Sequence, residues 1–406
     1  MSYNIENFFS EGLPGSVLAY SGFSRHNFVG GHNSEGSIPI NELAISAEKV
    51  IKEQGKNLAL YGHNSGPQGN LALREFLVSY LGGFTGMNIQ LDNILLTSGS
   101  LQALDLINKL LLNSNDTVLV EEATYGGAIS RIKSLGVNHI GIKLDEEGIC
   151  LDHLVSTLDN LKLKNITPKF LYTIPTVQNP TATIMPENRR KKIIEIAEKY
   201  NFLIIEDDCY ADLTWDRKRP KSIYSFCKDD RVIYCGSFSK SIAPALRVGY
   251  IVASWQVISK ILAFKNDGGS GAIEQMILAD FCSKNYKKHA STLVKELKRK
   301  CDLMIQALEI EFGSIAEFDI PKGGIFIWIT FPDIINTNKL YEEALKKGIA
   351  LNPGSEWVSN PRDGMNKIRL CFANPSDKTI KKGVNRLAEI CFQEFGVPNI
   401  SANIKR

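Results

Sequence analysis

Short apolar runs alternate with longer amphipathic segments through the first 255 residues or so of the chain. Apolar runs bounded by polar residues predict strands at 93–98, 117–122, 138–144, 169–175, 202–208, 231–239 and 248–254. Apolar residues spaced three and four apart predict helices at 71–81, 101–112, 126–135 and 186–200, the last of which opens on a proline. Strands that alternate with helices are typical of a mainly parallel, doubly wound sheet, so we expect an α/β fold.

The pattern changes beyond residue 255. A long lysine-rich helix is predicted at 283–312, then a strand at 323–331, a helix at 339–347 and a short strand at 367–373. The first forty or so residues are rich in glycine and asparagine and predict an irregular arm. We therefore expect three parts: an arm with part of a small domain (1–48), a large domain (49–283) and a small C-terminal α+β domain (284–406).

The composition is that of an ordinary globular protein, with 44% hydrophobic and 22% charged residues among 406. The 47 basic and 44 acidic residues leave a net charge of +3, which gives no reason to expect nucleic acid or an anionic membrane as a partner. No apolar run reaches the roughly 18 residues of a membrane span. The N-terminal stretch MSYNIENFFSEG carries acids and no long apolar run, so we expect no signal peptide and a cytoplasmic protein.

Neither the eight cysteines nor the six histidines show the spacing of a metal site. No two cysteines form a CxxC pair, and most of them lie within apolar runs such as YCGSF and RLCFA. The sequence therefore predicts reduced, mostly buried thiols and no metal.

In a doubly wound sheet, ligands bind beyond the carboxyl ends of the strands. The predicted strand at 231–239 leads into GSFSKSIAPALRVGY, which places Lys240 next to the hydroxyls of Ser237 and Ser239, with Arg247 seven residues on. Hydroxyls and a guanidinium suit a phosphate-bearing ligand. A lysine held among cations has a lowered pKa and can act as a nucleophile near neutral pH. Taken alone, this interpretation is no stronger than that of a surface loop.

Two other predicted strands also end in polar residues. FLIIEDDCYAD (202–212) places Asp207 at a strand end, where a buried carboxylate needs a cationic partner such as a pyridinium nitrogen. Tyr210 follows within reach of the same ligand. YTIPTVQNPTA (172–182) places Asn179 in an Asn-Pro turn, from which an amide can donate to a phenolate oxygen. Taken alone, that segment is better interpreted as a plain turn.

A fourth segment, LLTSGSLQALDL (95–106), joins a strand to a helix through Ser-Gly-Ser. Such a junction can hold an anion at the helix N-terminus, or it can be an ordinary serine N-cap. It is not GxGxxG and no P-loop lysine follows, which disfavours a dinucleotide or ATP site. All four segments suit the same phosphate-bearing, pyridine-containing ligand.

The order of these motifs resembles the fold-type I pyridoxal 5'-phosphate (PLP)-dependent aminotransferases of class I/II. Ser-Gly-Ser, Asn-Pro-Thr, Asp-x-x-Tyr and Ser-x-Ser-Lys follow one another, with an arginine seven residues after the lysine. EDDCY and GSFSKSIAPALRVGY are most similar to the subgroup of 2-aminoadipate and kynurenine aminotransferases and MocR-like regulators. The resemblance covers nearly the whole chain. It implies a large PLP-binding domain, a smaller α+β domain and a homodimer with shared active sites.

The resemblance also implies a role for each site residue. As implied catalytic residues, Lys240 forms the Schiff base and moves a proton, Asp207 pairs with the pyridine nitrogen and Tyr125 stacks on the ring. The remaining implied contacts are Asn179 and Tyr210 to the phenolic oxygen; Ser100, the backbone of Leu101, Ser237, Ser239 and Arg247 to the phosphate; Tyr61 to the phosphate of the neighbouring subunit; and Arg369, Gly31 and Asn179 to the substrate.

The expected function is transfer of an amino group from an L-amino acid to a 2-oxo acid, with 2-oxoglutarate as the default acceptor, by a ping-pong mechanism. The arm reads GGHN (30–33) where relatives often have Gly-Gly-Leu-Pro, which leaves the substrate open. One alternative is another PLP reaction on the same fold, such as decarboxylation, racemisation or oxidation. A second is a ligand-sensing domain of a MocR-type regulator, which is disfavoured because the PLP-fold pattern begins within the first sixty residues.

Overall fold

The computed structural model describes residues 4–9, 16, 19, 22–61 and 65–398, so only part of the N-terminal stretch 1–12 is described. A seven-stranded sheet lies at its centre in the order β2-β10-β9-β8-β7-β3-β4. Its strands are β2 (Ile94–Thr97), β3 (Thr117–Glu121), β4 (Asn138–Ile142), β7 (Phe170–Thr173), β8 (Leu203–Asp207), β9 (Val232–Ser237) and β10 (Gly249–Val252). Neighbouring strands pair in parallel except β10, which is antiparallel to β2 and β9. The predicted mainly parallel sheet is confirmed.

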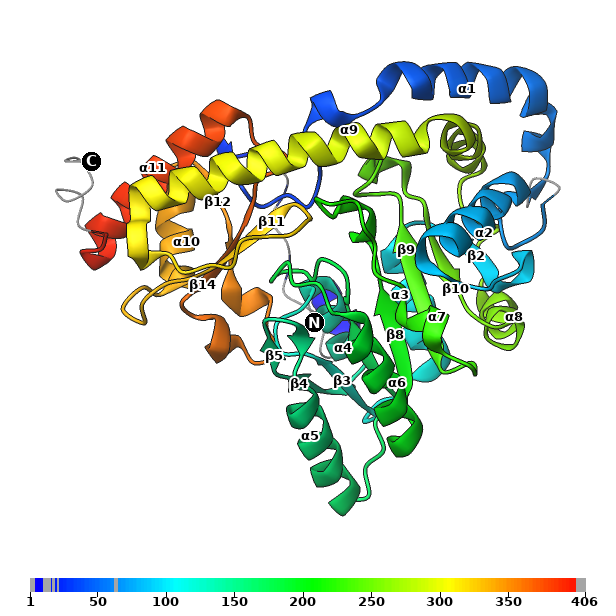
Figure 1. Cartoon of the computed structure of the whole chain (residues 1–406), viewed down its shortest axis with the longest axis horizontal. Helices are drawn as coiled ribbons and strands as arrows, with labels where there is room; N and C mark the ends of the chain where they lie inside the picture. Colours follow the sequence, from blue (N-terminus) through cyan, green and yellow to red (C-terminus); the bar gives the residue numbers. More distant parts are fainter. Residues whose placement is uncertain (1–3, 10–15, 17–18, 20–21, 62–64, 399–406) are drawn as a thin grey trace.

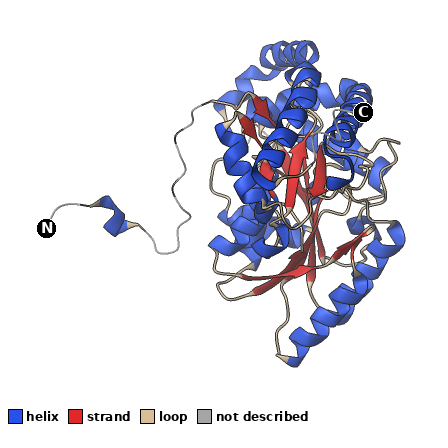
Figure 2. Cartoon of the chain, turned by 90° about the vertical axis from the view of Figure 1, so that its left-hand side faces the viewer, coloured by secondary structure: helices blue, strands red, loops and turns tan. Residues whose placement is uncertain are grey.

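Helices cover both sides of this sheet (Figure 2). They are α2 (Leu71–Thr85), α3 (Ser100–Leu111), α4 (Gly126–Ser134), α5 (Leu151–Leu163), α6 (Glu187–Tyr200), α7 (Ile223–Phe226) and α8 (Trp255–Phe264). Every residue of β2, β3, β7, β9 and β10 is buried, because both faces of the sheet are covered. Apolar runs without polar alternation are the sequence pattern that such burial requires.

Several element boundaries differ from the predicted ones. Pro186 is the N-cap of α6 and not its first helical residue. The predicted strand 138–144 ends at Ile142, and the following residues form a short hairpin of β5 (Leu144–Asp145) and β6 (Gly148–Ile149). Helices α5 and α8 were not predicted.

The long helix α9 (Ala272–Phe312) runs along the whole molecule and connects its two halves (Figure 1). It begins eleven residues before the predicted start, because its first turns carry buried apolar side chains, including Met276 and Leu278, and not the lysine-rich pattern used to predict it. The expected boundary between residues 283 and 284 thus falls inside a continuous helix. The division into 1–48, 49–283 and 284–406 stays a prediction.

The C-terminal half contains a three-stranded antiparallel sheet of β11 (Phe326–Thr330), β14 (Lys367–Cys371) and β13 (Asn352–Pro353). Helices α10 (Thr337–Lys346) and α11 (Asp377–Phe395) belong to it; α11 was not predicted. The arm joins this half because β1 (His26–Asn27) pairs in parallel with β12 (Ile349–Ala350). The predicted irregular arm ends at Ile40, where α1 (Ile40–Gln54) begins and packs on α9.

Within the described part of the chain, no helix combines the length and the apolar character that crossing a bilayer requires. All eight cysteines are free thiols, and five of them are buried. These thiols are therefore packing residues or lie near the site described next.

Candidate active site

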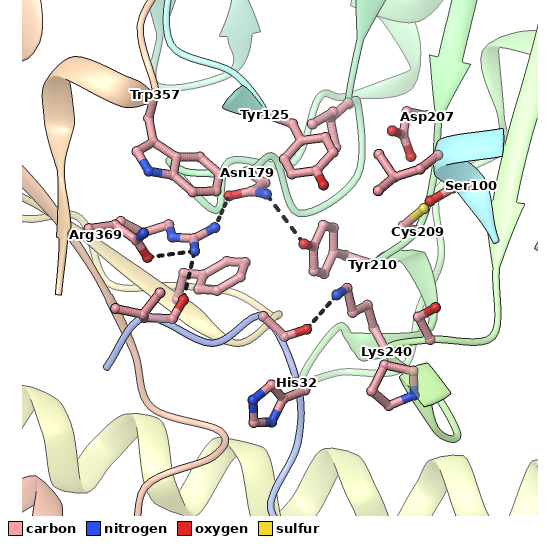
Figure 3. A pocket seen from close by; sticks show the side chains of 18 of the residues that line it. His32, Ser100, Tyr125, Asn179, Asp207, Cys209, Tyr210, Lys240, Trp357 and Arg369 are labelled. Carbon is pink, nitrogen blue, oxygen red and sulfur yellow. Dashed lines mark hydrogen bonds between the residues drawn. The ribbon is translucent and has the colours of Figure 1, made fainter. Parts of the chain in front are cut away.

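A cavity of about 410 Å³ lies where the carboxyl ends of β7, β8 and β9 face the C-terminal half and the arm (Figure 3). Of the thirteen site residues that the sequence predicts, eleven line it: Gly31, Ser100, Leu101, Tyr125, Asn179, Asp207, Tyr210, Ser239, Lys240, Arg247 and Arg369. These residues come from the arm, from five segments around the seven-stranded sheet and from strand β14 of the C-terminal half. The chain therefore folds so that all four motifs meet at one place.

Lys240 follows β9 in a turn, and its side chain extends into the cavity. Its Nζ donates a hydrogen bond to the carbonyl of Gly31 on the arm. Burial lowers the pKa of the Lys240 ammonium, and the positive charges of Arg369 and Arg247 lower it further. A lysine with a lowered pKa has a larger neutral fraction near pH 7, which is the form that attacks a carbonyl carbon.

Asp207 ends β8 and is 4% exposed. Its Oδ2 accepts a hydrogen bond of 2.7 Å from the hydroxyl of Tyr172, which is buried on the adjacent strand β7. Its Oδ1 is buried and accepts no hydrogen bond from any described residue. Burial raises the pKa of Asp207, so a cationic N–H donor at Oδ1 would stabilise the carboxylate. A protonated pyridine nitrogen is such a donor, and the residues fit PLP in this respect.

Arg369 lies between two aromatic rings, with its Cζ 3.8 Å from the ring centroid of Phe326 and 3.5 Å from that of Trp357. Its Nη2 donates to Asn352 Oδ1 at 2.8 Å and to the carbonyl of Val29 at 3.1 Å. No described carboxylate forms an ion pair with it, and burial lowers its pKa to about 10. A buried guanidinium held only by neutral acceptors is a suitable partner for an anionic ligand.

The segment before α3 forms a corner between the N-terminus of that helix and Arg247. The N-cap of α3 is Gly99, and no side chain caps the helix, so the alternative of an ordinary serine N-cap is wrong. Gly99 has φ +80°, and a Cβ there would lie 2.4 Å from Nη2 of Arg247. Arg247 therefore lies directly over the glycine, and its Nη2 donates to the Ser98 carbonyl at 3.1 Å. A guanidinium beside a helix N-terminus is an arrangement that suits a phosphate.

Two hydroxyls flank this corner. Ser237 Oγ donates to Ser239 Oγ at 3.0 Å. Only Ser239 lines the cavity, and Ser237 supports it from the end of β9. The predicted role of both serines in binding phosphate stays a prediction, with Ser239 the nearer of the two to the cavity.

Tyr125 lines the cavity immediately before α4, and its ring centroid lies 6.0 Å from that of Trp357. Tyr61 does not line it. Its side chain is 95% exposed and lies beside Gly268, since a Cβ on that glycine would be 3.1 Å from Cδ1 of Tyr61. In its own chain Tyr61 thus lies away from the site, and its predicted contact with a neighbouring subunit stays a prediction.

Sequence reasoning missed several residues of the site: Val29, His32, Tyr172, Ile174, Cys209, Pro244, Phe326, Asn352 and Trp357. For two of them the sequence held an indication of a place in the site. His32 lies in the unusual GGHN segment, and Cys209 lies between Asp207 and Tyr210. Asn352 lies in the two-residue strand β13 and Trp357 in the connection that follows it, and nothing in the local sequence pattern shows that they approach Arg369.

Comparison with known proteins gives consistent results. The profile of the family described as Aminotransferase class I and II matches residues 34–387. An aromatic-amino-acid aminotransferase from Thermococcus litoralis is 33% identical over 91% of this chain and 88% of its own. An HTH-type transcriptional regulator from Bacillus subtilis is 34% identical over 87% of this chain and 72% of its own. The structure of a kynurenine aminotransferase from Pyrococcus horikoshii, in complex with PMP, has a TM-score of 0.89 and 33% identity, covering 96% of this chain and 98% of its own.

Proposed function

Because the chain belongs to the class I and II aminotransferases and is a PLP-dependent enzyme of fold type I, we propose that it transfers the amino group of an L-amino acid to a 2-oxo acid. The default acceptor is 2-oxoglutarate. The observation that supports this proposal most directly is the meeting of three groups in one cavity: the Lys240 amine, the Asp207 carboxylate and the Arg369 guanidinium. Among the described residues, Asp207 Oδ1 accepts no hydrogen bond and Arg369 forms no ion pair with a carboxylate.

PLP, when bound, supplies an aldehyde carbon that joins to amines and a pyridine ring that withdraws electrons from the joined carbon. Lys240 would hold PLP through its Nζ, and the same Nζ, when neutral and free, would be the base that moves a proton at the substrate Cα. The lowered pKa of Lys240 supports this role, because a base must be neutral before it accepts a proton.

The other residues orient the reacting groups. Arg369 binds the substrate α-carboxylate, and the planar fork of a guanidinium fixes both oxygens of that group. Asp207 keeps the pyridine nitrogen protonated, which maintains the electron-withdrawing power of the ring. Asn179 Nδ2 and the Tyr210 hydroxyl, 3.3 Å apart, face the same region and suit the phenolic oxygen. Ser100, Leu101, Ser237, Ser239 and Arg247 are the proposed phosphate contacts, Tyr125 the ring contact and Gly31 part of the substrate wall.

The direct test is Lys240→Ala. We expect the variant to lose the visible absorbance band that forms when PLP is added to the wild-type protein, and to lose turnover. The exposed Lys298→Ala is a suitable control, since that lysine pairs only with Asp302 on the surface of α9. A Lys240→Ala protein that keeps both the band and the activity would overturn the proposal.

A panel of L-amino acids with 2-oxoglutarate, followed as glutamate formed, would then identify the donor. Incubation with an amino acid alone separates transamination from other PLP reactions. Transamination converts the cofactor to pyridoxamine phosphate, whereas decarboxylation or racemisation returns it as PLP.

We further propose a homodimer in which Tyr61 contributes to the site of the neighbouring subunit. Tyr61 is exposed in the single chain. So are five large apolar side chains along α1 and the segment after it: Ile40, Ile45, Ile51, Leu58 and Leu60. Burial of such a surface by a second copy would remove it from water. Sedimentation analysis should give twice the mass of one chain, and Tyr61→Phe should weaken PLP binding. A monomer with full activity would contradict this part of the proposal.

A further inference from the structure

The backbone of the Lys240 turn is held by two side chains from distant segments. The carbonyl of Lys240 accepts a hydrogen bond of 2.7 Å from Nδ2 of Asn33, which lies 207 positions earlier on the arm. The carbonyl of Ser241 accepts one of 2.8 Å from Nε2 of His289 on α9. Lys240 lies in a turn and not in a helix or strand, so no regular ladder of backbone hydrogen bonds fixes its backbone. The two side-chain bonds satisfy the carbonyls of the turn and hold its backbone in place.

Both donors are themselves restrained. Asn33 is 5% exposed, and its own carbonyl accepts a bond of 3.4 Å from Nδ2 of Asn374, five residues after Arg369. The His289 ring packs edge-on against Phe281, with 5.8 Å between centroids and 72° between planes. These contacts hold the arm backbone at Asn33 and the ring of His289 in place.

The arm also connects the lysine to the substrate-binding arginine. Within five residues, the arm carbonyl of Val29 accepts from Arg369, that of Gly31 accepts from Lys240 Nζ, and the side chain of Asn33 donates to the Lys240 carbonyl. A shift of this short segment would thus move the lysine backbone together with the wall of the cavity.

We propose that Asn33 and His289 are positioning residues for Lys240, which set the place of its Cα so that Nζ reaches both the cofactor carbon and the substrate Cα. A lysine side chain has four rotatable bonds, so its reach depends on where its backbone is anchored. A misplacement of about 1 Å costs on the order of 10²-fold in rate. This inference rests on the proposed function, because it assigns Lys240 as the reacting amine.

The test compares variants that keep or remove the donor. His289→Phe keeps a ring against Phe281 and removes the N–H, whereas His289→Gln keeps a donor and removes the ring. Asn33→Leu removes the other donor and keeps the number and branching of the side-chain heavy atoms. For each protein, three quantities are measured: the rate at which the visible band appears after PLP is added to protein stripped of cofactor, kcat and KM with one amino acid, and the thermal midpoint.

We expect His289→Phe and Asn33→Leu to slow band formation and lower kcat at least tenfold, with KM changed less than threefold. His289→Gln should restore most of the loss. The matched control is His139→Phe, because His139 makes the same kind of bond to a carbonyl, that of Ser359 at 3.2 Å, away from the cavity. It should change stability at most, and leave band formation and kcat as in the wild type.

The proposal is overturned if the folded Asn33→Leu protein forms the band and turns over at wild-type rates, or if His289→Gln is as impaired as His289→Phe. It is also overturned if His139→Phe shows the same kinetic losses. Should His289→Phe fail to fold, the rates measured for Asn33→Leu test the proposal without it, because Asn33 reaches the Lys240 carbonyl from the arm. Failure of the proposed function has a different result, since Lys240→Ala would then keep the visible band.

Discussion

Arg369 and Asn179 are 190 positions apart in the chain, yet Nη1 of the arginine donates a hydrogen bond of 3.1 Å to Oδ1 of the asparagine. This bond determines which way the amide faces. With Oδ1 turned to the guanidinium, Nδ2 points to the Tyr210 hydroxyl at 3.3 Å and is available as a donor in the cavity. The proposed carboxylate-binding group and the proposed phenolate-binding group therefore orient each other.

Arg369→Lys should raise KM for the amino acid about 10- to 100-fold, because an ammonium cannot replace both the bidentate contact to a carboxylate and the bond to Asn179. The visible band of the bound cofactor should remain, since the phosphate contacts are unchanged. Steady-state kinetics and an absorbance spectrum measure both effects. Arg386→Lys, on an exposed part of α11, is the control. A KM for Arg369→Lys within twofold of wild type would rule out this role.

Asp207→Asn should lower kcat at least about 100-fold, because a neutral amide cannot keep the pyridine nitrogen protonated. Tyr172→Phe removes only the bond of 2.7 Å to Oδ2 and leaves the carboxylate, so we expect a smaller loss, about tenfold. The two variants should therefore differ in kcat under saturating PLP. Equal activity in Asp207→Asn and wild type would show that the carboxylate is not needed.

Gly99→Ala should weaken PLP binding at least about tenfold, because the new Cβ would lie 2.4 Å from Nη2 of Arg247 and the backbone has φ +80°. Spectroscopic titration of the cofactor measures the change. Gly83→Ala on α2 is the matched control, since its Cβ would meet open space. That change should stabilise the helix by about 0.5–1 kcal/mol. Unchanged cofactor affinity in Gly99→Ala would contradict the position assigned to Arg247.

Glu121 predicts a pH dependence of stability. It is fully buried at the end of β3 and accepts hydrogen bonds from Thr124, Thr173, the Ile174 N–H and Gln178. Burial raises its pKa to about 6 from the ordinary 4.5. Because the pKa is raised in the folded state, its contribution is fully present below pH 4.5 and is lost as pH rises through 6.

Between pH 5 and pH 7.5, Glu121 should therefore reduce the free energy of unfolding of the wild type by about 1 kcal/mol. Glutamine does not titrate in this range, so the unfolding free energy of Glu121→Gln should lack this change with pH. Relative to wild type, the variant should therefore be more stable by about 1 kcal/mol at pH 7.5 than at pH 5. Urea unfolding at the two pH values, with saturating cofactor, measures the shift. A difference that does not change with pH would contradict the raised pKa.

Local pattern predicted the strands well and some helix boundaries poorly. Five strands of the central sheet, β2, β3, β7, β9 and β10, are buried throughout, so each of them is an apolar run that stands out in the sequence. The start of α9 was missed because its first turns pack apolar side chains such as Met276, whereas the prediction followed the lysines of its exposed part. Helices α1 and α11 were missed near the ends of the chain, where both pack on α9, a partner far away in the sequence.

By itself, the sequence determined the order of the motifs and the α/β class, because short apolar runs alternate with helices along the chain. It predicted Lys240, Asp207 and Asn179 close to strand ends, which parallel strands bring to one edge of a sheet, and the resemblance of the motif order to a known family implied the roles of these residues and of Arg247. Only the tertiary structure decided which other groups meet them. Asn33 and His289 approach Lys240, and Trp357 and Asn352 approach Arg369, through contacts between segments far apart in the chain. Such contacts depend on how the arm and the two halves pack together, and local periodicity carries no information about that packing.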